Sequence, residues 1–177
     1  MRHTKIYNLS ASLFLTWALH KQVIPRIRGI IEHYVHHISV TKYQSLVPHP
    51  NSGSVVQHQH AAAWFDAENM PTILREANVA LSESDVSIIY KDLRLNGRVD
   101  QLYKYRDGYI LVDTKSHEEV TFRDQLQMSF YAIILYLKGY KLYDTAYIRS
   151  VRNGHVNYLE LEIIPLDAMK EVLDSVD

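Results

Sequence analysis

The sequence contains no cysteine. Disulfide bridges, thiolate zinc sites, iron–sulfur clusters and cysteine nucleophiles are therefore excluded as the basis of its fold or its chemistry. At 177 residues the chain is long enough to bury a core without covalent cross-links. Hydrophobic residues make up 47% and charged residues 22% of the chain, a balance that argues against global disorder and indicates one globular domain.

Long apolar runs are missing as well. The richest, Leu13 to Leu19, is interrupted by Thr16 and followed by His20 and Lys21. It falls well short of the ~20 apolar residues that a membrane helix needs. The first residues, Arg2 to Lys5, show no small-residue cleavage pattern. We therefore expect no signal peptide, no membrane span and an intracellular protein.

Several catalytic sequence motifs are also absent. The chain has no Gly-rich phosphate loop, no Gly-x-Ser-x-Gly segment and no His-Glu-x-x-His segment. Nucleotide-hydrolysing motors and serine hydrolases are therefore poorly supported.

Charge is distributed unevenly, although the net charge is only −1. Residues 1–50 hold six Lys or Arg against one acid, whereas residues 151–177 hold two against six. A basic region beside an acidic site suits a polyanionic substrate and a bound cation. Such a layout also arises by chance, so the charge pattern only permits this interpretation.

Hydrophobic spacing and turn residues predict an α/β (α+β) fold in which helices flank one central mixed sheet. We expect residues 1–50 to form an N-terminal helical segment packed on a core of residues 51–177, in a single domain. Helices are expected from near Leu13, over Pro25–Ile38, from Ser52 or Ser54 to Phe65, over Phe122–Leu137 and over Pro165–Val176. Strands are expected over Val86–Tyr90, Leu93–Tyr103, Tyr109–Thr114, Ala146–Val151 and Val156–Ile164.

The hairpin around Asp107-Gly108 places three charged residues together. If these two are the central turn residues, Asp100 faces Lys115 and Leu102 faces Asp113. Because side chains alternate along a strand, Asp100, Asp113 and Lys115 then share one face of the sheet.

Two carboxylates on the same face of neighbouring strands can hold one divalent cation through oxygen ligands, with Mg²⁺ or Mn²⁺ as the expected ions. Such an ion lowers the pKa of a water molecule and polarises a phosphodiester oxygen. Lys115 can position or deprotonate the water, or stabilise charge on the phosphate. The set therefore fits phosphodiester hydrolysis, while the competing interpretation is a solvated ion-pair ladder on a strand.

Three short motifs occur in order around this hairpin. The chain reads Gly97-Arg98-Val99-Asp100, then Val112-Asp113-Thr114-Lys115, then Gln127 to Ala132 with Tyr131 four residues after Gln127. Over roughly residues 50–165 it resembles the PD-(D/E)xK nuclease superfamily, specifically the RecB-like exonuclease branch. The resemblance implies a restriction-endonuclease-like core, metal-dependent DNA cleavage by Asp100, Asp113 and Lys115, and a supporting, DNA-holding role for Gln127 and Tyr131.

The resemblance also implies further metal ligands. Relatives often carry a His on a helix after a small residue, and Ser54 to His58 has that small-x-x-x-His shape. His58 and the backbone carbonyl of Thr114 are therefore the expected additional ligands. His60 competes with His58, but a helix points residues two apart to different sides. Glu76 is a weaker candidate, because some relatives carry an acid before the first strand.

The N-terminus resembles the opening of many RecB-like nucleases, including the CRISPR-adaptation type, through Leu9 to Ser12 and Trp17. Those proteins often place a Cys three residues after the aromatic residue to hold an iron–sulfur cluster. Here His20 stands at that place and no cysteine exists, so we expect no iron–sulfur cluster. The departure puts a CRISPR role in doubt but leaves the nuclease core untouched.

The expected function is thus a metal-dependent DNA nuclease, in first place an exonuclease on DNA ends or single strands. A structure-specific endonuclease and a non-catalytic nucleic-acid-binding module remain alternatives, as does a protein with no nucleic-acid role. The expected partner is single-stranded DNA or duplex ends, with recruitment by a second protein and the oligomeric state left open. Salt dependence of binding is expected to reside mainly in Lys21, Arg26 and Arg28.

Overall fold

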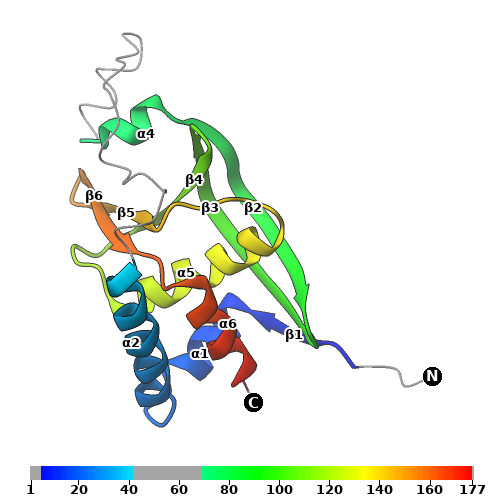
Figure 1. The fold of residues 1–177 in the computed structure, drawn as a ribbon. Helices are drawn as coiled ribbons and strands as arrows, with labels where there is room; N and C mark the ends of the chain where they lie inside the picture. The colour runs from blue at the N-terminus through cyan, green and yellow to red at the C-terminus, as the bar shows by residue number, and fades with distance from the viewer. Residues whose placement is uncertain (1–4, 42–68, 177) are drawn as a thin grey trace.

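The computed structural model describes residues 5–41 and 69–176, and shows a mixed six-stranded sheet flanked by helices, an α/β fold (Figure 1). The strands are β1 (Tyr7–Ser10), β2 (Asn78–Tyr90), β3 (Leu93–Tyr105), β4 (Gly108–Lys115), β5 (Thr145–Arg152) and β6 (His155–Glu162). The helices are α1 (Ala11–Ala18), α2 (Ile24–Thr41), α4 (Thr72–Glu76), α5 (Phe122–Leu137) and α6 (Leu166–Asp174). No helix within these ranges is long and apolar enough to cross a membrane.

Strand β3 pairs with three other strands of the sheet, β1, β2 and β4. Along one edge it pairs antiparallel with β2 over nearly its whole length. Its other edge is shared: β1 runs parallel to Leu93–Asn96, and β4 runs antiparallel to Gln101–Tyr105. Four residues between these segments, Gly97 to Asp100, have no strand partner on that edge within the described residues. The edge of β3 therefore contains a gap bounded by the ends of β1 and β4.

The remaining strands complete the sheet beyond β4. Strand β5 pairs parallel with β4, and α5 supplies the crossover that a parallel pair requires. Strand β6 returns antiparallel to β5 around Asn153 and Gly154. Both residues have positive φ, +51° and +77°, as a primed two-residue hairpin turn requires. The turn expected at Asn153-Gly154 is confirmed.

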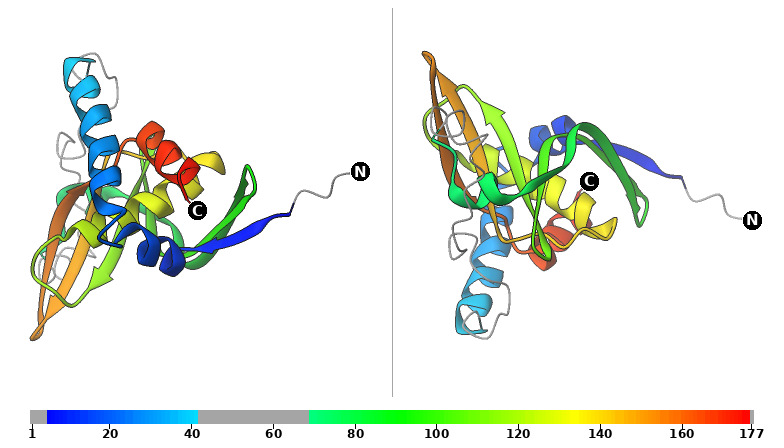
Figure 2. Two further views of the ribbon diagram at one scale, coloured as in Figure 1. Left: turned by 90° about the horizontal axis from the view of Figure 1, so that it is seen from below. Right: turned by 90° about the horizontal axis from the view of Figure 1, so that it is seen from above.

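Helices cover the two faces unequally. Helices α1, α2, α5 and α6 pack on one face around a core that includes Phe14, Ile27, Phe130 and Met169. The short α4 packs on the other face with a smaller cluster. Figure 2 shows α2 extending away from the sheet, whereas α5 lies close against it. Most residues of α5 are buried, so this helix is a fixed reference for any side chain that it carries.

Helix α5 begins and ends where the sequence predicts. Thr121 Oγ1 accepts the Asp124 amide at 3.1 Å, and Asp124 Oδ2 accepts the Thr121 amide at 2.9 Å, a reciprocal capping box. The helix ends at Leu137, and Gly139 follows with a φ of +103° that favours glycine.

The expected N-terminal helices are present as α1 and α2, but a strand that was not expected precedes them. Tyr7–Ser10 forms β1 and belongs to the same sheet as the rest of the chain. Ser10 then caps α1 by accepting the Leu13 amide at 3.1 Å. The helix expected from Ser52 or Ser54 to Phe65 lies outside the described residues, whereas α4 was not expected.

The register of the β3–β4 hairpin also differs from expectation. Tyr105 pairs with Gly108, so Arg106 and Asp107 occupy the turn and the pairing is displaced by two residues. A Cβ on Gly108 would collide with the ring of Tyr143, which explains why glycine stands just after the turn. A two-residue shift preserves alternation, so the predicted sharing of one face survives the error.

Candidate active site

The three charged residues lie where β3 and β4 part. The paired register ends at Gln101 and Val112, and its next step places Asp100 opposite Asp113. The sequence expectation opposed Asp100 to Lys115, and the two-residue shift corrects this. Asp100 is therefore the last residue of the four-residue gap in β3, and Asp113 begins the part of β4 that still pairs with β5 but no longer with β3.

Asp100 is half-buried, and its carboxylate replaces part of the missing ladder. Its Oδ2 accepts the backbone amide of Thr114 at 2.8 Å. This bond fixes the side chain toward β4 and satisfies an amide that β3 no longer reaches. The predicted ligand role of the Thr114 carbonyl remains a prediction, because the observed contact uses the amide of that residue.

Asp113 is the buried member of the pair, with 8% of its surface exposed. Lys115 Nζ lies 3.2 Å from its Oδ2, yet this oxygen has no well-aligned hydrogen-bond partner within the described residues. Burial raises the pKa of Asp113, Lys115 opposes the rise, and the charges of Asp100 and Asp124 add to it. A buried, incompletely compensated carboxylate oxygen is costly unless a proton or a cation satisfies it.

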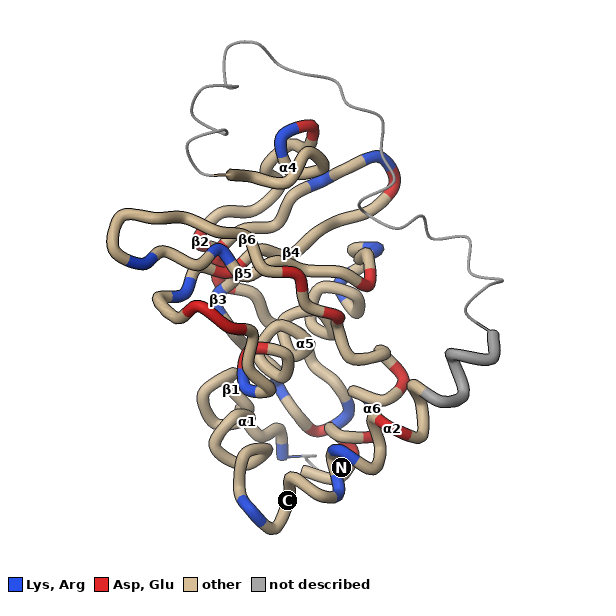
Figure 3. The backbone as a smooth tube through the Cα atoms, turned by 90° about the vertical axis from the view of Figure 1, so that its left-hand side faces the viewer, with Lys and Arg blue, Asp and Glu red and all other residues tan. Residues whose placement is uncertain are grey.

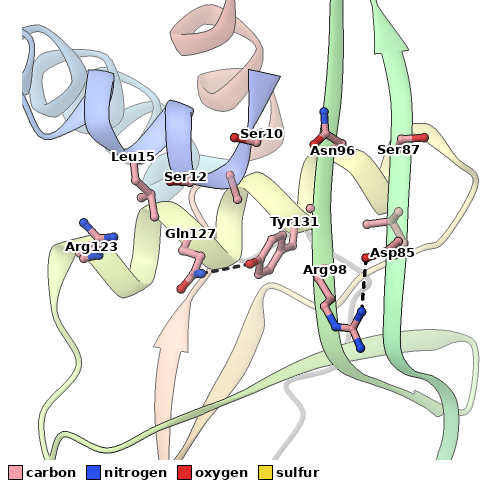
Figure 4. Close-up of a pocket in the computed structure, with 13 residues that line it drawn as sticks. Ser10, Ser12, Leu15, Asp85, Ser87, Asn96, Arg98, Arg123, Gln127 and Tyr131 are labelled. Carbon is pink, nitrogen blue, oxygen red and sulfur yellow. Dashed lines mark hydrogen bonds and ion pairs between the residues drawn. The ribbon is translucent and has the colours of Figure 1, made fainter. Parts of the chain in front are cut away.

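Helix α5 supplies the next layer of side chains. Gln127 Nε2 donates to Tyr131 Oη at 3.0 Å, one helical turn apart on the same face (Figure 4). The tyrosine hydroxyl accepts this bond, so its own proton remains available for a further acceptor. Burial raises the pKa of Tyr131, and the charges of Asp113 and then Asp100 raise it further. The structure thus brings the predicted pair, Gln127 and Tyr131, close to both carboxylates.

The ring of Tyr131 explains the glycine of the Gly97-x-x-Asp100 segment. A Cβ on Gly97 would lie 2.6 Å from Tyr131 Cε1, closer than real Cβ contacts. Gly97 has an ordinary φ, so the requirement is for space and not for an unusual backbone. Gly97 of the first motif and Tyr131 of the third motif therefore contact each other, and this contact packs α5 against the gap in β3.

A second buried acid, Asp124, was not singled out from the sequence. Asp124 is 2% exposed, caps α5, and lies 2.7 Å from His117 Nε2. Ser150 Oγ on β5 donates to the His117 carbonyl at 2.6 Å. The loop between Lys115 and α5 is therefore held by α5 through Asp124 and by β5 through Ser150. The Thr121-x-x-Asp124 capping pattern is readable in the sequence, but its contact with His117 is tertiary.

The described residues offer two carboxylates for a metal ion. No group of three or more His, Asp or Glu side chains converges in residues 5–35 and 69–176, and Glu76 joins no such group. His58 and His60 lie outside the described residues, so their predicted roles stay predictions. The orphaned oxygen of buried Asp113, with Asp100 across from it, fits a divalent cation that prefers oxygen ligands.

A groove opens beside these residues, between α1, the β2–β3 pair and α5 (Figure 4). Its volume is about 530 Å³. Its polar lining consists of Ser10, Ser12, Asp85, Ser87, Asn96, Arg98, Arg123, Gln127 and Tyr131. Of these, only Gln127 and Tyr131 were given a site role from the sequence. Ser10, Ser12 and Arg98 lie in segments that carry the resemblance but were given no role, and the others meet only in the fold.

Comparisons with known proteins assign no family. No protein-family model matches the chain, and no curated protein matches it. Among solved structures, the crystal structure of SSO0001 is similar with a TM-score of 0.43 and 10% sequence identity. That alignment covers 98% of this chain and 76% of the other.

Proposed function

We propose that this chain is a metal-dependent DNA nuclease that hydrolyses phosphodiester bonds, similar to the RecB-like branch of the PD-(D/E)xK superfamily. The observation that carries the proposal is the state of Asp113. Its carboxylate is buried, it lies 3.2 Å from Lys115, and one oxygen lacks a well-aligned partner in the described part of the chain. A folded protein has no structural need for this cost, whereas a metal-dependent hydrolase does.

Asp100 and Asp113 are the residues that would hold a Mg²⁺ or Mn²⁺ ion. When bound, the ion supplies a water molecule of lowered pKa and an electrophile for the phosphodiester oxygen. The two carboxylates are held in place by different parts of the structure. Asp100 is oriented by the Thr114 amide, and Asp113 is held by strand pairing of β4 with β5.

Lys115 and Tyr131 act on the substrate in this proposal. The Lys115 ammonium beside Asp113 is placed to position the attacking water or to stabilise charge that develops on the phosphate. The Tyr131 hydroxyl, which accepts from Gln127, can donate its proton to a phosphate oxygen. Gln127 therefore orients Tyr131, and Gly97 allows the ring to approach.

Cleavage assays with a matched substitution test this function. Labelled single-stranded and duplex DNA would be incubated with Mg²⁺, Mn²⁺ or EDTA. We expect metal-dependent cleavage that falls by about 10²–10³-fold in Lys115→Ala, the usual effect of losing one charge-stabilising group. Lys141→Ala is the control, because Lys141 is exposed and precedes the isolated bridge between Leu142 and Tyr109.

Thermal unfolding provides a readout that does not need substrate. A metal ion that binds only the folded state at ten to a hundred times its Kd contributes about 1.4–2.7 kcal/mol. For a chain of this size, that amount raises Tm by roughly 3–10 °C. Mn²⁺ should produce the rise in the wild-type chain and not in an Asp100→Asn, Asp113→Asn double variant. Equal shifts in both proteins, together with metal-independent or absent cleavage, would reject the proposal.

A further inference from the structure

The groove beside the candidate site has an arginine at the end where α5 begins. Arg123, in the first turn of that helix, lines the groove at the end where α5 begins (Figure 4). Phe122, the residue before it, lies under Arg28 of α2, whose guanidinium carbon is 4.2 Å from the ring centroid. This stacking places the Arg28 charge at the first turn of α5, over the residue that precedes Arg123 in the chain.

These two cations have no acidic partner. No ion pair or hydrogen bond joins Arg28 or Arg123 to another of the described side chains, and both residues are exposed. Some other cations are paired, Arg98 with Asp85, Lys91 with Asp174 and Arg152 with Glu118, so Arg28 and Arg123 differ from these three in having no carboxylate among the described residues to compete with an incoming anion. Figure 3 shows Lys and Arg interspersed with Asp and Glu over the chain, so no broad face of one sign accounts for the pattern.

The groove itself favours contacts to a backbone over contacts to bases. Its polar lining is rich in hydroxyl and amide groups, and its single aromatic ring, Tyr131, is only 6% exposed. Base stacking needs an exposed ring face, so it contributes little here. The groove is enclosed by α1 on one side and by β2 and β3 on the other. At about 530 Å³ it has room for one or two nucleotides of a single strand.

We infer that one DNA strand lies in this groove and leaves it over the start of α5, with successive phosphates on Arg123 and Arg28. The inference rests on the proposed nuclease function and adds the path of the strand and two phosphate contacts. Single-stranded DNA or duplex ends are the substrate already expected from the sequence. Arg28 was expected from the sequence to carry salt dependence, and its stacking on Phe122 places it at the start of α5, the helix whose Arg123 lines the groove. Arg123 is an additional member that the sequence did not single out.

Binding measurements on the full chain test the strand path. Fluorescence anisotropy of a labelled twelve-nucleotide dT strand, and of a duplex of equal length, would be measured in EDTA across a salt series. Each phosphate contact to a single strand contributes about 0.7 to the slope of log K against log salt. Arg123→Ala and Arg28→Ala should each flatten the slope by about 0.7 and weaken binding about fivefold at 0.1 M salt. The double variant should lose about 25-fold.

Arg106→Ala is the matched control. Arg106 lies 5.1 Å from the Tyr105 ring centroid, so the substitution removes the same charge and a similar ring contact at the β3–β4 turn. Its affinity and salt slope should equal those of the wild type. Arg28→Lys should keep most of the affinity, because phosphate binding needs the charge. This variant also separates binding from any folding effect of the lost ring contact.

Two outcomes would overturn the inference. The first is that Arg123→Ala and Arg28→Ala bind DNA with the same affinity and salt slope as Arg106→Ala. The second is that the duplex binds as tightly as the single strand. Either result, with metal-dependent cleavage still lost in Lys115→Ala, would reject the strand path and leave the nuclease function standing. Failure of the proposed function is a different result, in which the wild-type chain cleaves no DNA with either metal ion.

Discussion

Two hairpins of the sheet, β3–β4 and β5–β6, each have a two-residue turn, yet their pairing ends differently. Strands β5 and β6 pair over all of Thr145–Arg152 and His155–Glu162. Strands β3 and β4 pair only from the turn to Gln101 and Val112. Beyond that point β3 leaves, while β4 stays paired with β5 through Lys115. The acidic pair occurs where one neighbour of β4 is lost and the other still fixes its backbone.

The β5–β6 hairpin is completely paired, whereas the β3–β4 hairpin is paired only near its turn, and the two differ in what they contribute to the structure. The fully paired hairpin satisfies its backbone and contributes to the sheet. The hairpin with a parted end gives up ladder bonds and gains room for a buried carboxylate, a lysine and a groove. We interpret complete pairing as a contribution to stability, and interrupted pairing beside a fixed strand as the location of the proposed chemistry. The following substitutions, from the largest expected effect to the smallest, test this division.

Asp113→Asn should abolish the proposed activity, because it removes the negative oxygen that faces Lys115. We expect a loss of at least about 10²-fold in metal-dependent cleavage, the scale of removing one charge-stabilising group. Glu160→Gln on β6 removes a charge from the fully paired hairpin and should leave the rate within a few-fold. Similar losses in both variants would break the contrast between the two hairpins.

Gly97→Ala and Gly108→Ala should destabilise the chain by similar amounts but differ in activity. Each new Cβ meets a tyrosine ring, Tyr131 or Tyr143, and such overpacking costs about 1–3 kcal/mol. Only Gly97→Ala displaces a side chain of the candidate site, so only it should lower kcat, by about tenfold or more. Urea unfolding and cleavage rates of the folded proteins would be compared. Tyr131→Leu should restore part of the stability of Gly97→Ala without restoring its rate.

Asp113→Asn should also raise the Tm of the metal-free chain at neutral pH. Burial raises the pKa of Asp113, so its charged form costs folding free energy that a neutral amide does not. Every kcal/mol gained corresponds to roughly 2–4 °C in a chain of this length. As pH falls through the raised pKa toward the unfolded value of about 3.9, the folded state takes up the proton first. The Tm difference between the two proteins should therefore shrink with acidification in EDTA.

Gly154→Ala should have the smallest effect. Gly154 has a φ of +77°, and no atom lies within 4 Å of the position of an added Cβ, so the substitution adds backbone strain without a clash. Such strain costs about 1–2 kcal/mol. Cleavage should be unchanged, because the β5–β6 turn contributes nothing to the candidate site. A lower rate per folded molecule would show that the two hairpins are coupled.

Local signals in the sequence predicted much of this fold. Helix α5 was predicted at its observed bounds because its apolar spacing and the following Gly139 both act locally. The β5–β6 turn was predicted because Asn153 and Gly154 tolerate positive φ. Strand β1 was missed because its four residues, Tyr7–Ser10, are too short for a periodic pattern. The prediction of the β3–β4 register was wrong because Gly108 is needed to make room for the Tyr143 ring and not to form the turn. No local pattern encodes that contact.

The candidate site was predictable to the same degree. Asp100, Asp113 and Lys115 were grouped correctly because alternation along strands survives a two-residue register shift. The burial of Asp113 and the orientation of Asp100 by Thr114 depend on where β3 departs, which is a property of the whole sheet. The contact between His117 and Asp124 depends on the return of the chain into α5. His58, the expected fourth ligand, lies outside the described residues.

The hydrogen bond from the Thr114 amide to Asp100 has a spectroscopic consequence. A backbone amide that donates to a carboxylate has a proton resonance that depends on the charge and direction of that carboxylate. Because the bond is 2.8 Å long and joins the two strands, the Thr114 signal reports directly on Asp100. Titration with a cation that engages Asp100 shifts this signal, while amides within β6 stay in place. One backbone resonance thus reads the state of the site without a labelled substrate.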